Sequence, residues 1–390
     1  MTKHRNLFLP FKYHLLTSMT IALATGILWK SLDYSLIGPF TLIALVAAIH
    51  FTTPHKNKYL VKTIFLLFSI FLAGAFLYTQ KINSQASFYK EVDNKTCDLI
   101  ATVKDVARWP GKRHKQTILL DLKKVKEKNT MTWKSYPRKS IRLYIKNAVP
   151  LQVADTIKLK NITFKRPKNP SYSLYLIKEN TSISLFTDTL QYETIQRPSY
   201  SLSRLISQKR AHLAKNIKER MAPKTFELFS SIFLGAKKIE KKHAQQLKHR
   251  FKYWGVLHFL ARSGLHLILF LLLCEIVLKL LPIHFAIKQG ILITISTLYL
   301  LLSWPSVSFI RAFAAFVLYK LCPLLNIKPD LFHIVTLICF SMLLYNPIQL
   351  FFIDFQLSFA LTAALALCNK IQTQKKRQAQ LVFKKSTQTP

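Results

Sequence analysis

The sequence has few acidic residues and few glycines. Only 17 Asp and Glu side chains accompany 57 Lys and Arg, which gives a formal net charge of +40. A basic excess of this size favours an anionic partner, and nucleic acid and anionic lipid headgroups are the two main candidates. A lysine-rich composition set by an AT-biased genome is a second explanation of the charge, because Lys, Asn and Ile are frequent and only eight glycines occur.

The sequence also lacks the patterns of common catalytic and metal sites. It has no evident Ser/His/Asp triad, no P-loop, no Rossmann fingerprint and no HxHxDH signature of metallo-β-lactamase-type hydrolases. Its five cysteines form no CxxC pair, no His/Cys cluster has zinc spacing, and Cys97 is alone in the polar middle of the chain. We therefore expect no enzyme, no metal, no cofactor and no disulfide within that polar region.

Long apolar runs are abundant, since half of the residues are hydrophobic. Together with the high charge, this composition is typical of a membrane protein whose charges are confined to loops and polar domains. The first run follows a basic start without a small-residue cleavage site after it, so we interpret it as a retained helix and not as a signal peptide. With about 20 apolar residues needed per helix, about eight transmembrane spans are predicted, near 13–30, 35–53, 61–79, 256–281, 288–304, 306–323, 331–346 and 348–368.

The distribution of Lys and Arg orients these spans. Lys3, Arg5 and Lys12 place the N-terminus in the cytoplasm, and the following connections alternate between basic and weakly charged. Under this rule the polar residues 81–253 are largely external, and the Lys/Arg-rich tail is cytoplasmic. The predicted location is the cytoplasmic (inner) membrane of a bacterium, crossed several times.

The external region divides into two parts. Five short runs with alternating or β-branched character, separated by polar turns, predict a small OB-like β-barrel at 81–195. The runs are "CDLIATV", "QTILLDLKKV", "SIRLYIKN", "DTIKLKNITF" and "TSISLF". Residues 196–253 predict basic amphipathic helices, which lie on membrane surfaces or bind polyanions. The flanking domains are an N-terminal membrane region at 1–80, a membrane core at 254–369 and a tail at 370–390.

Basic and aromatic residues alternate in the predicted β domain. Lysines that pair with phosphates and aromatic rings that stack on bases are typical of a surface that binds single-stranded nucleic acid. An ordinary lysine-rich surface, with the aromatic residues packed inside the barrel, explains the same pattern equally well. The candidate DNA contacts are Trp109, Lys112, Arg113, Lys115 and Trp133.

Polar residues gather at the start of the fourth predicted span. His258, Arg262 and His266 are spaced i, i+4 and i+8, so in a helix they form one stripe, with Ser263 beside it. Gly264 allows another backbone to approach closely. Such a stripe facing a lumen suits the passage of an anion. In a second interpretation, His258 and Arg262 lie at the outer interface and reach to water. Metal ligation is disfavoured, because no carboxylate or cysteine accompanies the histidines.

Two further charges fall inside the later spans. Arg311 and Asp354 are both near the outer ends of their predicted helices, with Gln356 and Ser358 following Asp354. At similar depth on different helices, the two charges could pair with each other. In the functional interpretation, Arg311 lines an anion path and Asp354 orients it. All four residues are candidates for the wall of a pore.

Three segments resemble the ComEC-type competence proteins, which are inner-membrane channels for incoming transforming DNA. A G-x-x-H-L-L-A-x-S-G-L-H signature is matched by Gly255, His258, Ala261, Ser263, Gly264, Leu265 and His266. The family's Arg-Ala helix is matched by Arg311 and Ala312. A D-P…G-F-Q-L-S-F segment is matched by Pro347, Phe355, Gln356, Leu357, Ser358 and Phe359. The order of parts also agrees: N-terminal helices, an external OB-like domain and a channel core.

The resemblance implies a membrane channel component that takes up single-stranded DNA during natural transformation. It implies as partners single-stranded DNA, membrane lipids, a cytoplasmic DNA-translocating ATPase and a separate nuclease, and it is compatible with a homo-oligomer. Arg262 and Asp354 depart from the family pattern, which typically has a small or apolar residue and a glycine there. Family members often continue into further helices and a β-lactamase-like domain, so the chain is expected to be a shortened relative. The rival hypothesis is a degenerate or non-transporting membrane homologue, or a small-solute permease.

Overall fold

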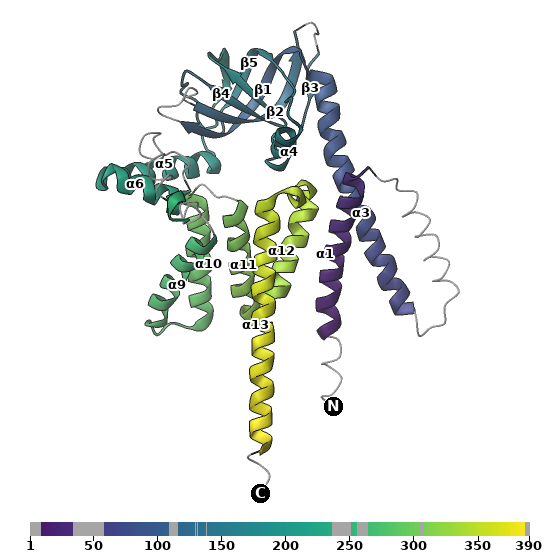
Figure 1. Ribbon diagram of the computed structural model, residues 1–390. Helices are drawn as coiled ribbons and strands as arrows, with labels where there is room; N and C mark the ends of the chain where they lie inside the picture. Colours follow the sequence, from purple (N-terminus) through teal and green to yellow (C-terminus); the bar gives the residue numbers. More distant parts are fainter. Residues whose placement is uncertain are drawn as a thin grey trace. The chain divides into compact units, whose positions relative to one another are not determined.

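The computed structural model describes residues 9–33, 58–108, 116–128, 130, 132–137, 139–235, 251–255, 264–303 and 307–386 (Figure 1). The chain forms two compact units, one of Met1–Lys81 with Ala314–Pro390 and the other of Ile82–Phe313. Two helices, α3 (Lys58–Val92) and α11 (Val307–Leu324), contribute residues to both units. The division within α3 falls between Lys81 and Ile82, and the division within α11 falls between Phe313 and Ala314.

In the first unit, α1 (Leu9–Ser31) packs closely on α3 through two glycines. A β-carbon built on Gly26 would lie 1.9 Å from the carbonyl oxygen of Phe71, and one built on Gly74 would lie 2.4 Å from that of Leu23. Only glycine permits this backbone contact, which is the way that small residues bring apolar helices together. The helices predicted at 13–30 and 61–79 are therefore present and directly packed.

The C-terminal part of the first unit contains α12 (Leu331–Tyr345), the 3₁₀ turn η3 (Pro347–Phe351) and α13 (Ile353–Ser386). Asp330 caps α12, since its Oδ1 accepts hydrogen bonds from the backbone amides of Phe332 and His333, and its Oδ2 lies 3.5 Å from Lys370 Nζ. No glycine or proline occurs within α13. The helix predicted near 348–368 therefore begins five residues later and continues through most of the predicted tail.

The second unit contains a β domain with one mixed seven-stranded sheet (Figure 1). The strands are β1 (Thr96–Arg108), β2 (Gln116–Glu127), β3 (Lys134–Ser135), β4 (Ser140–Ile145), β5 (Thr156–Thr163), β6 (Ile183–Thr187) and β7 (Tyr192–Gln196). They pair in the order β6-β4-β2-β1-β5-β7, with β3 on β2, and only the β4–β6 pair is parallel. All five predicted strands are confirmed. The closed OB-like barrel stays a prediction, because the paired strands describe a path with β6 and β7 at its ends.

The β domain has its own hydrophobic core. Along β2 the side chains alternate between buried and partly exposed from Gln116 to Leu122, as a strand with one covered face requires. The core contains residues of five strands and also Phe88, Tyr89 and Val92 from the end of α3. The last turns of α3 thus contribute to the core of the β domain.

The other helices described wholly within the second unit follow or interrupt the sheet. They are α4 (Pro170–Lys178), α5 (Leu202–Arg220), α6 (Pro223–Phe229), the π-helix η2 (Ser230–Leu234), α9 (Gly264–Lys279) and α10 (Phe285–Leu302). Asn169 caps α4 by accepting from the amides of Ser171 and Tyr172, and Pro170 occupies its first turn. The predicted basic helix after residue 196 is present as α5.

Two helices in the described part of the chain are long and apolar enough to cross a membrane. They are Lys62–Val92 of α3 and Phe285–Leu302, which is α10. Leu15–Ser31 of α1 and Leu331–Tyr345 of α12 are shorter apolar helices. Membrane association is thereby supported. The prediction of about eight spans stays a prediction, and the span at 35–53 lies outside the described residues.

Candidate functional site

The first group of candidate residues lies where α9 begins. Gly264 is the first residue of α9, and a β-carbon built on it would lie 2.6 Å from Cβ of Ala312 in α11. The close approach predicted for Gly264 is therefore found, and it is made to the Arg311-Ala312 pair. Arg311 itself is only 5% exposed. A cation on an apolar helix that faces the protein interior is typical of functional positions in membrane proteins.

The ring of His266 lies beside a cluster of aromatic side chains. Its ring lies 6.3 Å, centroid to centroid, from that of Phe233 in the π-helix η2. The hydroxyl of Tyr299 on α10 donates a 2.8 Å hydrogen bond to the backbone carbonyl of Phe233, and the Tyr299 ring contacts those of Phe270 and Phe309. The π-helix, α9, α10 and α11 thus meet around one aromatic cluster, and His266 stands at its edge. The sequence did not indicate η2, because π-turns leave no simple residue pattern.

The other pore candidates are distributed differently. Asp354, Gln356 and Ser358 lie on the first turns of α13 in the first unit, where Asp354 and Gln356 are exposed and Ser358 is partly buried. Gln356 Nε2 donates to the carbonyl of Leu350, which closes the turn between η3 and α13. Asp354 occupies a favourable position for an anion at a helix N-terminus. His258, Arg262 and Ser263 lie outside the described residues, so their predicted stripe stays a prediction.

Of the DNA-binding candidates, only Trp133 is described. Its ring is partly buried and lies 6.0 Å from Lys158 Nζ of β5, as in a cation–π pair. The remaining candidates, Trp109, Lys112, Arg113 and Lys115, lie outside the described residues.

An exposed aromatic face on β4 and β6 was missed in the sequence. In the parallel register of these strands Tyr144 is opposite Phe186, and their rings stack with centroids 4.8 Å apart and planes 11° apart. Phe186 is 64% exposed. Arg142 and Ser184, two register pairs earlier, lie on the same face. The alternation of Arg142 and Tyr144 with buried neighbours was a signal in the sequence, but the pairing with Phe186 required the fold.

Helix α4 supports this aromatic face. The hydroxyl of Tyr172 lies 2.8 Å from Ser184 Oγ, and Arg142 Nη2 lies 3.8 Å from Glu179 Oε2 at the end of α4. Burial raises the pKa of Tyr144, and the nearby Arg142 lowers it in part. The Tyr144 phenol is therefore neutral at physiological pH and presents an uncharged ring beside a guanidinium.

A groove borders the aromatic face between β5 and β6. It has a volume of about 450 Å³ and its polar lining comes from Asn161, Thr163, Lys165, Ser184 and Thr187, with Phe186 at its side. A cation, several hydrogen-bonding side chains and an exposed ring are the groups that bind a nucleotide by phosphate contact and base stacking. Among the described residues, no cluster of three or more His, Cys, Asp or Glu side chains could hold a metal ion.

Comparison with known proteins identifies the C-terminal part of the chain. The family model described as "Competence protein" matches residues 234–389. No curated protein and no solved structure matches the chain. The matched residues include Gly264, His266, Arg311, Gln356 and Ser358. Residues 234–389 are thus similar to the competence protein family, in agreement with the resemblance to ComEC-type competence proteins.

Proposed function

We propose that this protein is a channel component that conducts single-stranded DNA across the cytoplasmic membrane during natural transformation. The observation that carries the proposal is the family match at residues 234–389, together with the direct packing of two of its motifs. Gly264 of the S-G-L-H motif lies against Ala312, so Arg311 and His266 belong to helices in contact. Two cationic or protonatable groups near one helix crossing suit the passage of a polyanion.

The proposed membrane arrangement follows the positive-inside rule. About eight helices cross the membrane, with both termini in the cytoplasm and residues 81–253 largely external. The apolar helices α3 and α10 support this arrangement. The external domain is proposed to be OB-like, and it receives the incoming strand.

The β domain is proposed to bind DNA through its aromatic face. The stacked rings of Tyr144 and Phe186 offer a platform for a base, and Lys165 in the adjoining groove offers a phosphate contact. Trp109, Lys112, Arg113, Lys115 and Trp133 are proposed as further DNA contacts. Base stacking on an aromatic side chain contributes about 1–3 kcal/mol per base.

Motive force is proposed to come from outside this chain. The protein acts as a conduit and not as an enzyme, and a cytoplasmic DNA-translocating ATPase pulls the strand. A separate nuclease supplies the single strand. Assembly as a homo-oligomer is compatible with this role.

Binding of a fluorescent single-stranded oligonucleotide to the purified full-length protein tests the DNA contact. We expect affinity to fall steeply with salt, because each phosphate contact adds about −0.7 to the slope of log affinity against log salt. Phe186→Ala should weaken binding by roughly tenfold or more, since one stacked base is lost. Tyr200→Ala removes an aromatic residue that is 80% exposed but lies outside this face, and it should leave the affinity unchanged. Absence of binding even at low salt would contradict the proposal.

A further inference from the structure

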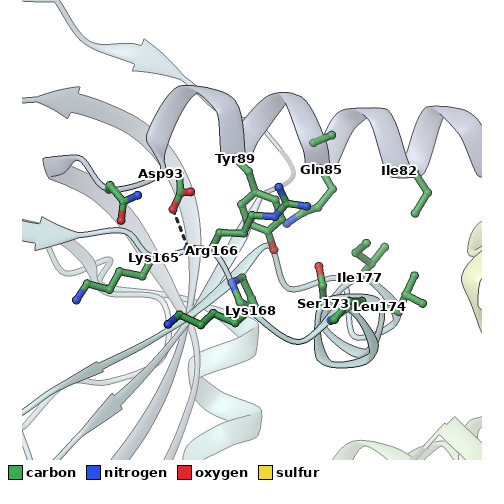
Figure 2. A pocket seen from close by; sticks show the side chains of 14 residues that line it. Ile82, Gln85, Tyr89, Asp93, Lys165, Arg166, Lys168, Ser173, Leu174 and Ile177 are labelled. Carbon is green, nitrogen blue, oxygen red and sulfur yellow. Dashed lines mark hydrogen bonds between the residues drawn. The ribbon is translucent and has the colours of Figure 1, made fainter.

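A second cavity lies at the junction of α3 with the β domain (Figure 2). Its volume is about 690 Å³, and it is formed by the end of α3, the segment 165–168 and α4. All of these belong to the second unit. Of the residues that line this cavity, only Lys165 also lines the groove proposed above to contact DNA.

The two ends of the cavity differ in chemistry. Ile82, Leu174 and Ile177 gather at one end, whereas Lys165 and Lys168 extend at the other (Figure 2). A third cation, Arg166, lies over the ring of Tyr89 at 5.5 Å between the two ends. Three cations face one carboxylate, that of Asp93. The cavity is therefore apolar at one end and positively charged at the other.

Hydrogen bonds within the protein hold the wall of the cavity in place without a ligand. Gln85 Nε2 and the Tyr89 hydroxyl both donate to the carbonyl of Ser182, at 2.5 and 2.8 Å. Asp93 Oδ1 accepts from the backbone amide of Arg166 at 2.8 Å, which fixes the basic segment against α3. The carboxylate is thus engaged with a backbone group, and the exposed Lys165 and Lys168 side chains stay available to an anion.

The position along α3 gives the depth of the cavity relative to a membrane. The apolar run of α3, predicted as a span at 61–79, ends two residues before Lys81. At about 1.5 Å per residue, the hydrocarbon core of about 30 Å is crossed by about Lys81. Ile82 and the next two turns then lie in the headgroup layer. The apolar end of the cavity is nearest to the hydrocarbon, and Asp93 and the basic segment follow farther along the helix.

We propose that this cavity binds a phospholipid with an anionic headgroup, with the phosphate at Lys165, Arg166 and Lys168 and the first part of an acyl chain beside Ile82, Leu174 and Ile177. The charge and the apolar end fit the two parts of one molecule, and a nucleic acid would leave the apolar end uncovered. A bound lipid would brace α3, whose last turns belong to the core of the β domain. This inference rests on α3 crossing the membrane, and it is independent of DNA transport.

The test is native mass spectrometry of the full-length protein in detergent, titrated with phosphatidylglycerol or with phosphatidylcholine of the same acyl chains. We expect phosphatidylglycerol to bind and phosphatidylcholine to bind much more weakly. The double variant Lys165→Gln/Lys168→Gln should weaken phosphatidylglycerol binding by roughly thirtyfold, at about 1 kcal/mol for each basic residue near a lipid surface.

Two further variants separate the cavity from general charge and folding effects. Lys123→Gln/Lys124→Gln removes the same charge from exposed positions of β2 outside the cavity, and it should leave binding unchanged. Ala86→Trp keeps every charge but fills the cavity from an exposed position on α3, and it should reduce binding as strongly as the first double variant.

Three outcomes would overturn the inference. The first is equal binding of the two lipids, and the second is equal loss in both lysine double variants. The third is displacement of the lipid by glycerol phosphate or by a single-stranded oligonucleotide at comparable concentration, which would assign the cavity to free phosphate or to DNA. Oligonucleotide binding measured on Ala86→Trp, which keeps Lys165 and lies outside the proposed DNA groove, distinguishes failure of this inference from failure of the proposed transport function.

Discussion

At the scale of single residues, a buried ion pair joins α5 to the β domain. Asp155 is fully buried before β5, and its Oδ1 accepts from Arg204 Nη2 of α5 at 2.5 Å. Arg204 also donates to the carbonyls of Val153 and Pro198, at 3.1 and 3.0 Å. Such a pair is costly to break from one side, because the remaining charge stays buried without compensation.

We expect Asp155→Asn to lower the free energy of unfolding by about 3–5 kcal/mol. Arg197 is the matched control, since its Nε lies 3.9 Å from the same carboxylate but its side chain is 59% exposed. Arg197→Ala should cost less than about 1 kcal/mol. Pulse proteolysis in urea measures both values, and equal effects of the two substitutions would contradict the role assigned to Arg204.

Cys97 allows a second prediction at this scale. Burial, with a smaller contribution from the nearby Glu127, raises the pKa of its thiol to about 11. The folded state therefore favours the protonated thiol. This contribution to stability is complete below the unfolded pKa of about 8.5 and is lost as the pH rises toward 11.

We expect iodoacetamide at pH 8 to leave Cys97 largely unmodified in the native protein and to alkylate it in urea. Peptide mass spectrometry reports the extent of modification. Cys368, which is exposed, serves as the internal control and should react in both states. Rapid native labelling of Cys97 would show that the thiol is neither buried nor protonated as described.

At the scale of elements, the close packing of α1 on α3 depends on Gly26. Gly26→Leu would place a side chain into the carbonyl of Phe71, so α1 and α3 must separate. We expect a loss of about 3 kcal/mol, at the upper end of overpacking costs. Thermal unfolding in detergent measures it. Gly290→Leu is the control, because a β-carbon on Gly290 of α10 meets nothing within 4 Å, and this variant should be as stable as the wild type. Similar melting of both variants would disprove the close contact.

The elements also show what could be predicted from sequence. Period-two alternation predicted the five main strands, because each strand has one covered face. The close approach at Gly264 was predictable from its missing side chain. The stack of Tyr144 on Phe186 was not, because it depends on a parallel pairing of strands that are far apart in the sequence. The Asp155–Arg204 pair was not predictable either, because its residues are 49 positions apart and meet only when α5 packs on the β domain. The first part of α13 was predicted as a transmembrane span and the rest as a tail. Hydropathy falls along this segment, but the helical backbone continues through it.

At the scale of the whole molecule, the chain combines a membrane-associated helical part with a basic β domain. The competence family match covers α9 to α13, and the helix α3 connects the N-terminal apolar region to the β domain. In the proposed account, the β domain binds the strand and the helices around Gly264 and Arg311 pass it across the membrane. In this account, the net charge of +40 favours contact with both DNA and an anionic lipid surface.

The most direct test of the central claim is uptake of labelled DNA in a strain with a clean deletion of this protein. We predict that DNase-resistant, cytoplasmic label and transformants are both lost, and that the wild-type chain restores them. Arg311→Leu, which removes a buried charge from the motif helix, should fail to restore uptake although the protein reaches the membrane. Normal uptake of labelled DNA by the deletion strain would contradict the account.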